Sequence, residues 1–493
     1  MAPLLESSAA LGALLIAVYV VYALLSQRSR RVRLPPGPAG WPIVGNMFDV
    51  PKSGAEWIDY RNMGEKYDSD IIYLDVFGTR IVVLNSFEAI TELLEKRARI
   101  YSSRPRFVMV QELMGCEFDP QGKESIWNHP HQIHGVHETL HRLLESPDQW
   151  KSHFRHQAGA TILEIAYGVR AKTDEDPHIA AAEMTARYAA DGATPGKYLV
   201  DTLPWLKYVP AWIPGASFQA VAQEAKKVIA ASLSIPFEAV KAEMAQGIAN
   251  PSFTARCLEK VDQDGDIPYQ ESVIKDVAGV MFSAFPSQTA LTFSSFMLAM
   301  VKYPEVQAKA QRELDTILGP NNLPVFADKE DLPYLSALVK ECLRWEVLFP
   351  FSLPHLSTSD DVYNGYHIPA GTMVLPNTWA VLRDESVYPE AGNFNPDRYL
   401  TKEGNLDPSV RDPEAAFGYG RRICPGRHMA RESIWLTVGS ILACFKIENS
   451  VDVHGNVIEP SGKYLSGLLR QPEPFSCSIK PRSKEIVNII RGL

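Results

Sequence analysis

The residues with the clearest chemical potential lie in one short segment, Phe417-Gly418-Tyr419-Gly420-Arg421-Arg422-Ile423-Cys424-Pro425-Gly426. The apolar pattern over residues 429–445 predicts a helix directly after this segment, which places Cys424 at a helix N-terminus. Unpaired backbone N–H groups and the helix dipole favour negative charge at such a position, and they lower the pKa of a thiol. We therefore expect Cys424 to act as a thiolate ligand.

The neighbours of this cysteine suit a large, flat, anionic ligand. Pro425 has no N–H group to leave unbonded, so it fits the first turn of a helix. Gly420 and Gly426 let the backbone approach a bulky flat molecule. Arg422 supplies a cation that can pair with an acidic group on that molecule. The alternative interpretation is an inert buried cysteine in front of a helix.

Five of these residues match a known signature. Their spacing is that of Phe-x-x-Gly-x-Arg-x-Cys-x-Gly, the haem-binding motif of the cytochrome P-450 superfamily, with matches at Phe417, Gly420, Arg422, Cys424 and Gly426. The chain resembles this family to about residue 480, and in detail its membrane-bound fungal members of secondary metabolism. The resemblance implies a mainly α P-450 fold with a small N-terminal β subdomain.

The same resemblance implies a cofactor and partners. The cofactor is haem b with its iron bound by the Cys424 thiolate. NADPH–cytochrome P-450 reductase supplies electrons from NADPH, and one atom of O₂ enters a small lipophilic substrate. The implied activity is therefore that of a monooxygenase.

Other matches follow in the order that the family has them. Glu341 and Arg344 stand in a Glu-x-x-Arg pattern, and Arg398 lies in the later loop that completes a Glu-Arg-Arg network in the family. A carboxylate between two guanidiniums would hold the proline-rich chain beneath the cofactor, which is a structural role. His355 falls where the family often has a basic residue on a haem propionate, and the alternative for it is a surface histidine.

The central helix departs from the family pattern. Relatives carry a Gly, then an acid followed by Thr, for proton delivery, whereas this chain has Phe285, Ser287 and Gln288 at those positions. Ser287, Gln288 and Thr289 can organise a water chain instead, since each donates and accepts hydrogen bonds; the alternative is that they only pack. Pro286 removes an intrahelical N–H group and predicts a kink.

A second departure lies between Met114 and His141. Family members have a helix there whose Trp and Arg hold the haem propionates, and this chain is shorter, with Trp127 as a possible remnant. Either the haem is held more loosely, or the sequence comes from a faulty gene model or a decayed gene. Both departures keep open a non-oxidative isomerase or dehydratase, or an inactive relic.

A remote alternative comes from the histidine-rich part of this segment. His137, Glu138 and His141 form a literal HExxH motif, which can hold Zn²⁺ in a peptidase, with Glu164 as a conceivable third ligand. A peptidase would explain neither the cysteine segment nor the N-terminal apolar run. A solvated helix face is the ordinary explanation of the motif.

The N-terminus predicts a membrane anchor. Residues 9–25 are an uncharged apolar run at the short end of what crosses a bilayer, and arginines follow it at Arg28, Arg30, Arg31 and Arg33. Because positive residues stay cytosolic, the N-terminus is expected in the lumen of the endoplasmic reticulum and the catalytic domain in the cytosol. A cleaved signal peptide would carry its basic residues before the run.

Composition and periodicity complete the expectations. A net charge of −9 argues against a nucleic-acid partner, and six cysteines without a CxxC pair indicate a reducing compartment. Residues 34–42 predict a stiff proline-rich hinge that separates the membrane from the globule, followed by one catalytic domain over 43–493. The expected elements are a hairpin at 71–76 and 80–84 and helices at 86–96, 162–169, 237–244, 273–300, 305–318, 332–347 and 429–445.

Overall fold

A computed structural model describes residues 33–114, 128–171, 176–194, 197–465 and 467–493 of the chain. The chain divides into two compact units. The described residues of unit 1 are 33–105, Pro350–Val381 and Gly418–Ile423. Unit 2 is larger and comprises the described parts of Arg106–Phe349, Leu382–Phe417 and Cys424–Leu493. The single catalytic domain over 43–493 stays a prediction.

Unit 1 is organised around a four-stranded sheet with the strand order β1-β2-β6-β3. The predicted hairpin is present, because Ile71 pairs with Leu84 in an antiparallel register. A third strand, parallel to β2, comes from far along the chain and was not expected. The strands are β1 (Ile71–Val76), β2 (Thr79–Leu84), β3 (His355–Leu356) and β6 (Met373–Pro376), with a separate hairpin of β4 (Asp361–Tyr363) and β5 (Tyr366–Ile368).

Short helices accompany this sheet. The helix expected over 86–96 is a short α-helix followed by a wider π-helical turn, and the Ser86 side chain caps it by accepting the Ala89 N–H at 3.0 Å. The helical segments are α2 (Glu56–Lys66), α3 (Phe87–Ile90), η1 (Thr91–Lys96), α4 (Ala98–Tyr101), α14 (Thr378–Leu382) and η9 (Gly420–Arg422).

The proline-rich hinge packs on unit 1 instead of standing clear of it. Pro35 is buried, and the Pro36 carbonyl accepts the Tyr73 N–H of β1 at 2.8 Å. Three residues before Pro36, the Arg33 carbonyl accepts the His367 N–H of β5 at 2.7 Å. These bonds form because proline removes a donor but leaves a carbonyl that a neighbouring strand can use. The hinge between membrane and globule stays a prediction.

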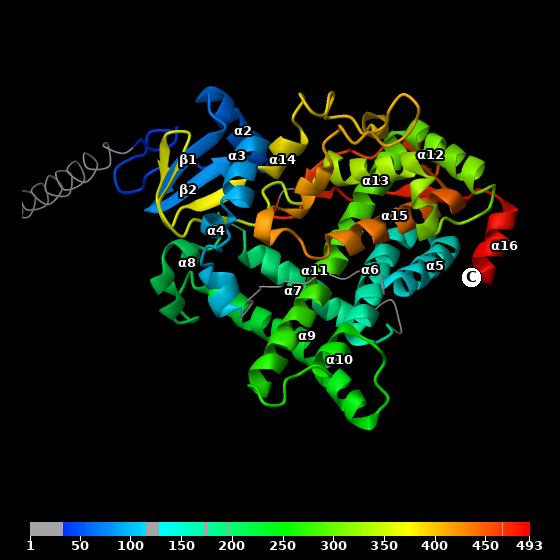
Figure 1. Ribbon diagram of the computed structural model, residues 1–493, viewed down its shortest axis with the longest axis horizontal. Coiled ribbons are helices and arrows are strands. Elements are labelled where there is room, and N and C mark those ends of the chain that lie inside the picture. Colours follow the sequence, from blue (N-terminus) through cyan, green and yellow to red (C-terminus); the bar gives the residue numbers. More distant parts are fainter. Residues whose placement is uncertain (1–32, 115–127, 172–175, 195–196, 466) are drawn as a thin grey trace, which may run out of the picture. The chain divides into compact units, whose positions relative to one another are not determined.

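Unit 2 is helical, and all the helices expected in it are present with longer or slightly shifted bounds. Figure 1 shows the long helix α11 running among α6, α7, α9 and α15, and it contacts each of them. The helices are α5 (His129–Glu145), α6 (Trp150–Tyr167), α7 (Pro177–Gly192), α8 (Leu199–Thr202), α9 (Ser217–Gln246), α10 (Phe253–Leu258), α11 (Ile267–Lys302), α12 (Pro304–Ile317), α13 (Pro333–Trp345), α15 (Arg427–Cys444) and α16 (Lys484–Gly492).

The core of unit 2 lies where these helices meet. Phe154 of α6 and Phe293 of α11 are fully buried, with ring centroids 5.0 Å apart, and Trp435 of α15 is buried in the same cluster. The helical backbone of α11 continues through Pro286. Small sheets close the unit, formed by β7 (Phe445–Val451), β8 (Val457–Ile458), β9 (Tyr464–Leu465), β10 (Gln471–Pro472) and β11 (Cys477–Pro481).

None of the helices in the described part of the chain is both long enough and apolar enough to cross a membrane. The anchor predicted at residues 9–25 lies outside the described residues.

The contact between the hinge and β1 can be tested at Gly37. A Cβ atom there would lie 2.0 Å from the Tyr73 carbonyl oxygen, so Gly37→Ala has to push the hinge off the sheet. We expect the free energy of unfolding to fall by about 1–3 kcal/mol, as for other overpacked sites. The control is Gly392→Ala, whose Cβ would meet only the Arg383 guanidinium at 3.9 Å. Equal unfolding midpoints for the two variants would contradict the docked hinge.

Candidate functional site

Cys424 lies directly before a helix, as its sequence context predicts. Gly426 is the N-cap residue of α15, and the helix begins at Arg427. The Cys424 N–H donates to the Phe417 carbonyl at 2.8 Å, which fixes the loop that leads into the helix. Pro425 occupies the turn before the N-cap and not the first helical turn that we expected.

The thiol of Cys424 is not made acidic by the helix terminus alone. Burial raises its pKa, while a hydrogen bond from the Gly426 N–H and the charge of Arg427 act in the opposite direction. The expectation of a lowered pKa neglected the cost of taking a thiolate out of water. A bound metal cation would remove that cost, because a coordinating thiol loses its proton.

The glycines of this segment serve the chain's own packing. Gly420 has a φ of 57°, and a Cβ atom there would lie 2.1 Å from the Leu94 carbonyl oxygen in unit 1. The space for a ligand that we inferred at Gly420 is thus taken by backbone. At Gly426 a Cβ atom would lie 3.9 Å from the Cys424 Sγ, an ordinary contact. Phe417 is half-buried, with the Arg431 guanidinium 5.4 Å from its ring centroid.

Unit 1 gathers basic side chains around His355. This histidine is buried on β3 and is not a surface residue, and its Nδ1 lies 2.7 Å from the Tyr101 carbonyl oxygen. Burial, followed by the charges of Arg104 and Arg422, lowers its pKa to about 3. Arg422 donates from Nε to the Ser102 carbonyl at 2.8 Å. A neutral histidine between two guanidiniums forms an environment that favours anionic groups.

Arg104 was missed in the sequence. Its Nη1 donates to the carbonyls of Leu353 and Pro354, at 2.8 and 2.9 Å. An arginine in an irregular segment carries no periodic signal, and the bridge between Ser103 and Leu356 that helps to bring this segment to β3 is a long-range contact. A Ser-Arg-Pro sequence between two elements is too common to have identified it.

Glu341, Arg344 and Arg398 meet in unit 2 as expected. Glu341 and Arg344 are both fully buried, and two bonds of 2.7 Å join the carboxylate to the guanidinium. Arg398 reaches the same carboxylate at 3.3 Å. The remaining N–H groups of Arg344 donate to the carbonyls of an irregular segment, those of Leu382, Ala391 and Asn393. Such carbonyls would otherwise be unpaired in the interior, so the cluster orders the chain that leads to Cys424.

The residues predicted for proton delivery lie on α11. Thr289 is buried and Gln288 is half-buried, whereas the side chains of Phe285 and Ser287 are outside what the structure describes. One turn and a half earlier, the buried Ser283 hydroxyl has no hydrogen-bond partner among the described atoms. The helix that carries them packs on α15, the helix that follows Cys424.

The histidine-rich helix α5 does not assemble a zinc site. Glu164, the conceivable third ligand, pairs with His131 at 3.3 Å and with Arg170 at 3.1 Å. Among the described residues no three His, Cys, Asp or Glu side chains lie close enough to share a metal ion. The zinc peptidase interpretation is therefore not supported. Trp127 lies outside the described residues, as does most of the shortened segment before α5.

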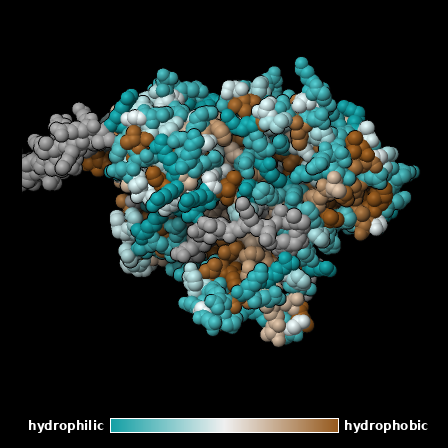
Figure 2. All heavy atoms as spheres, in the orientation of Figure 1, coloured by the Kyte–Doolittle hydropathy of each residue, from teal (hydrophilic) through white to brown (hydrophobic). Residues whose placement is uncertain are grey.

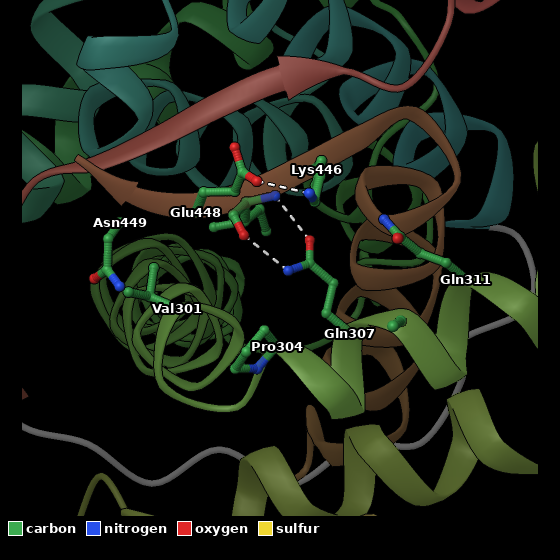
Figure 3. A pocket seen from close by; sticks show the side chains of 9 residues that line it. Val301, Pro304, Gln307, Gln311, Lys446, Glu448 and Asn449 are labelled. Atoms are coloured by element: carbon green, nitrogen blue, oxygen red, sulfur yellow. Dashed lines mark hydrogen bonds and ion pairs between the residues drawn. The ribbon is translucent and has the colours of Figure 1, made fainter. Parts of the chain in front are cut away.

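A surface pocket between α12 and β7 does not belong to the predicted site. Figure 3 shows Gln307 bridging to β7, where its amide donates to the Ile447 carbonyl at 2.8 Å and accepts the Ile447 N–H at 2.7 Å. Gln311 bonds the carbonyls of Leu442 and Phe445. The two glutamine side chains that line the pocket thus complete backbone hydrogen bonds and link α12 to α15 and β7. Their role is structural.

The buried carboxylate predicts a large stability effect. Glu341→Gln leaves two guanidiniums, 0% and 5% exposed, against a neutral partner. We expect a loss of about 3–5 kcal/mol in the free energy of unfolding. The matched control is Glu448→Gln, since Glu448 is 36% exposed between Lys446 and Lys480 and should change stability by less than about 1 kcal/mol. Denaturant unfolding measures both, and similar small losses would contradict a structural role for Glu341.

His355 predicts a loss of stability in acid. Folding lowers its pKa from 6.5 to about 3, so the unfolded chain takes up a proton that the folded chain does not. The stabilisation that the neutral His355 provides is fully present above the pKa of the unfolded chain, 6.5. It is lost as pH falls toward the pKa of the folded chain, about 3. Before cofactor is added, we expect the wild type to lose up to about 1.4 kcal/mol per pH unit more than His355→Asn. Urea unfolding measures both proteins between pH 6.5 and 4. If the free energy of unfolding falls equally with pH in the wild type and in His355→Asn, a neutral buried histidine is contradicted.

The residues present fit a haem group. A single cysteine thiol precedes a helix with an N–H group and a cation beside it, and basic residues in unit 1 gather near a neutral histidine. A thiolate suits the iron, and guanidiniums suit the propionate carboxylates of haem.

Comparisons with known proteins agree with this chemistry. The model of the cytochrome P450 family matches residues 130–479. Tryptamine 4-monooxygenase of Psilocybe cyanescens is 41% identical, over 96% of this chain and 97% of its own length. Cytochrome P450 monooxygenase 98 of Postia placenta is 40% identical, over 98% of this chain and 96% of its own length. Cytochrome P450 monooxygenase ple1 of Rhodocybe pseudopiperita is 38% identical, over 97% of this chain and 95% of its own length. The chain thus belongs to the cytochrome P450 family and is similar over nearly its whole length to fungal P450 monooxygenases.

Proposed function

We propose that this chain uses Cys424 to bind the iron of haem b and oxidises, typically by hydroxylation, a small lipophilic substrate of fungal secondary metabolism. The observation that carries the proposal is the position of Cys424 at the start of α15, with the Gly426 N–H and Arg427 beside its sulfur. One thiolate in this setting suits an iron ligand, and the family membership supports an oxidative reaction.

The chain's own residues would hold the cofactor through two kinds of contact. Cys424 would bind the iron, and Arg104 and Arg422 would pair with the propionates, with His355 beside them. His355 Nδ1 donates to the Tyr101 carbonyl in the neutral form, so the guanidiniums supply the positive charge. When bound, haem with a thiolate ligand activates O₂ so that one oxygen atom enters a C–H bond of the substrate.

Proton delivery is proposed for Gln288 and Thr289 of α11, with Ser287 beside them in the sequence. Thr289 is buried and keeps its hydroxyl away from bulk water, which suits a short relay through ordered water. The buried Ser283 hydroxyl on the same helix offers a further donor and acceptor.

Membrane attachment and the electron source are parts of the same proposal. Residues 9–25 would anchor the chain once across the endoplasmic reticulum membrane, with the arginines that follow on the cytosolic side. NADPH–cytochrome P450 reductase would deliver the electrons. Terpenoid, indole and polyketide substrates all suit the proposal, and the name of tryptamine 4-monooxygenase makes tryptamine one compound to test.

The oxidative reaction can be separated from isomerisation or dehydration by its stoichiometry. The assay contains reductase, ¹⁸O₂ and a panel of lipophilic compounds that includes tryptamine. We expect at least one compound to increase NADPH consumption at least about tenfold over the substrate-free rate, because a bound substrate is already held in position to react. Mass spectrometry should find one labelled oxygen in the product. A product formed without NADPH, or without label, would contradict a monooxygenase and favour the non-oxidative alternative.

A further inference from the structure

The helix that follows Cys424 is held differently along its length. Every residue of α15 from Ser433 to Cys444 is buried, so packing in the core holds that part. The first six residues, 427–432, include one buried side chain, Met429, and the others are partly or largely open to water. Their two arginines, histidine and glutamate fit a surface that is mainly hydrophilic in the view of Figure 2. Polar contacts must therefore hold the turns next to Cys424.

One face of these turns is held by two ion pairs. Arg427 pairs with Glu414 at 3.2 Å, and its Nη1 also donates to the Cys424 carbonyl at 3.4 Å. One turn later, Arg431 donates to the Asp412 carboxylate. Burial raises the pKa of Asp412, but the hydrogen bond and charge of Arg431 outweigh burial and lower this pKa overall. The carboxylate therefore stays ionised and keeps its hold on the helix.

Another face is held by the first residues of α5. The Asn128 amide, which is buried before this helix, donates to the Met429 sulfur at 3.5 Å. Nε2 of His129 lies 3.3 Å from the Glu432 carboxylate. The His129 ring also stacks on Phe326, with ring centroids 3.9 Å apart, so its position is fixed from a second side.

The two sets of contacts lie on nearly opposite sides of the helix. With 3.6 residues per turn, Arg427 and Arg431 share one face, and Met429 and Glu432 lie about 150° around the axis from them. Contacts on one face alone would leave the helix free to rock about that face. Contacts on both sides restrict its rotation and its axial position, because hydrogen bonds and ion pairs are directional whereas apolar packing is not.

We propose that polar contacts on two sides clamp the start of α15 and thereby set the direction of the Cys424 thiolate. The contacts of this clamp are Arg427–Glu414, Arg431–Asp412, Asn128–Met429 and His129–Glu432. The inference rests on the proposed iron ligand. These side chains are positioning residues, since they act on the ligand through the helix, and contacts of this kind orient metal ligands and tune their bonds.

The test removes one contact on each side in the full chain. Asp412→Asn keeps the shape of the side chain but removes the charge that holds Arg431. His129→Phe keeps a ring to stack on Phe326 but removes the nitrogen that lies beside the carboxylate of α15. The control is Thr372→Val, which removes a hydrogen bond of a fully buried side chain in unit 1.

The first readout is the carbon monoxide complex of the reduced, haem-loaded chain, in thiocyanate at a concentration that leaves the chain folded. The thiolate band should be lost about twofold faster in each single variant, since the other side still holds the helix. The double variant should lose it at least about tenfold faster, beyond the about fourfold product of independent effects. The control should keep the wild-type rate. A double variant at or below that product would overturn the clamp.

The second readout does not depend on the iron. Before haem is added, hydrogen–deuterium exchange over 427–432 should be at least about fivefold faster in the double variant, with 433–444 at the wild-type rate. Unchanged exchange over 427–432 would also overturn the clamp. If the wild type gives no thiolate band, the proposed iron ligand fails and the inference fails with it. If it gives the band but both variants behave as the control, the inference alone fails.

Discussion

The carboxylate of Glu341 is the constraint on which the architecture of unit 2 depends. It is fully buried, and its negative charge is matched by Arg344 and Arg398. Through Arg344, the same cluster satisfies carbonyls over a stretch that forms no long helix or strand. An irregular segment cannot satisfy its own backbone, so an internal donor set is needed to order it. The stretch from Leu382 to Asn393 therefore keeps its course without a long helix or strand.

The segment that carries the cysteine is shared between the two units. Residues 418–423 belong to unit 1, while Phe417 and the chain from Cys424 onward belong to unit 2. The thiol is therefore held by the packing of α15, whereas Arg422 is held by the Ser102 carbonyl beside the sheet. Helical packing in unit 2 thus positions the proposed iron ligand, and the sheet in unit 1 positions the proposed propionate partners.

Much of this could be predicted from the sequence, where a local signal existed. The spacing around Cys424 predicted its position before a helix, Ser86 predicted a helix cap, and the β-branched runs predicted the hairpin. Long-range pairing left no such signal: the segment with Arg104 reaches β3 through the bridge between Ser103 and Leu356, which are far apart in the sequence. The pKa of the thiol was wrongly expected to be low, because sequence shows the helix terminus but not the burial that opposes it. The bonds between residues 33–36 and the strands of unit 1 were likewise absent from the sequence analysis, because a proline-rich composition does not show which carbonyls a strand will use.

The central claim is that Cys424 binds haem iron as a thiolate, and the most direct measurement is the reduced carbon monoxide difference spectrum of the full chain. The account predicts the red-shifted Soret band of a thiolate ligand in the wild type and its loss in Cys424→Ala. Cys342→Ala is the matched control, because that cysteine is fully buried on α13 and should leave the band unchanged. A thiolate band that persists in Cys424→Ala, or a folded wild type that gives none after haem is supplied, would contradict the account.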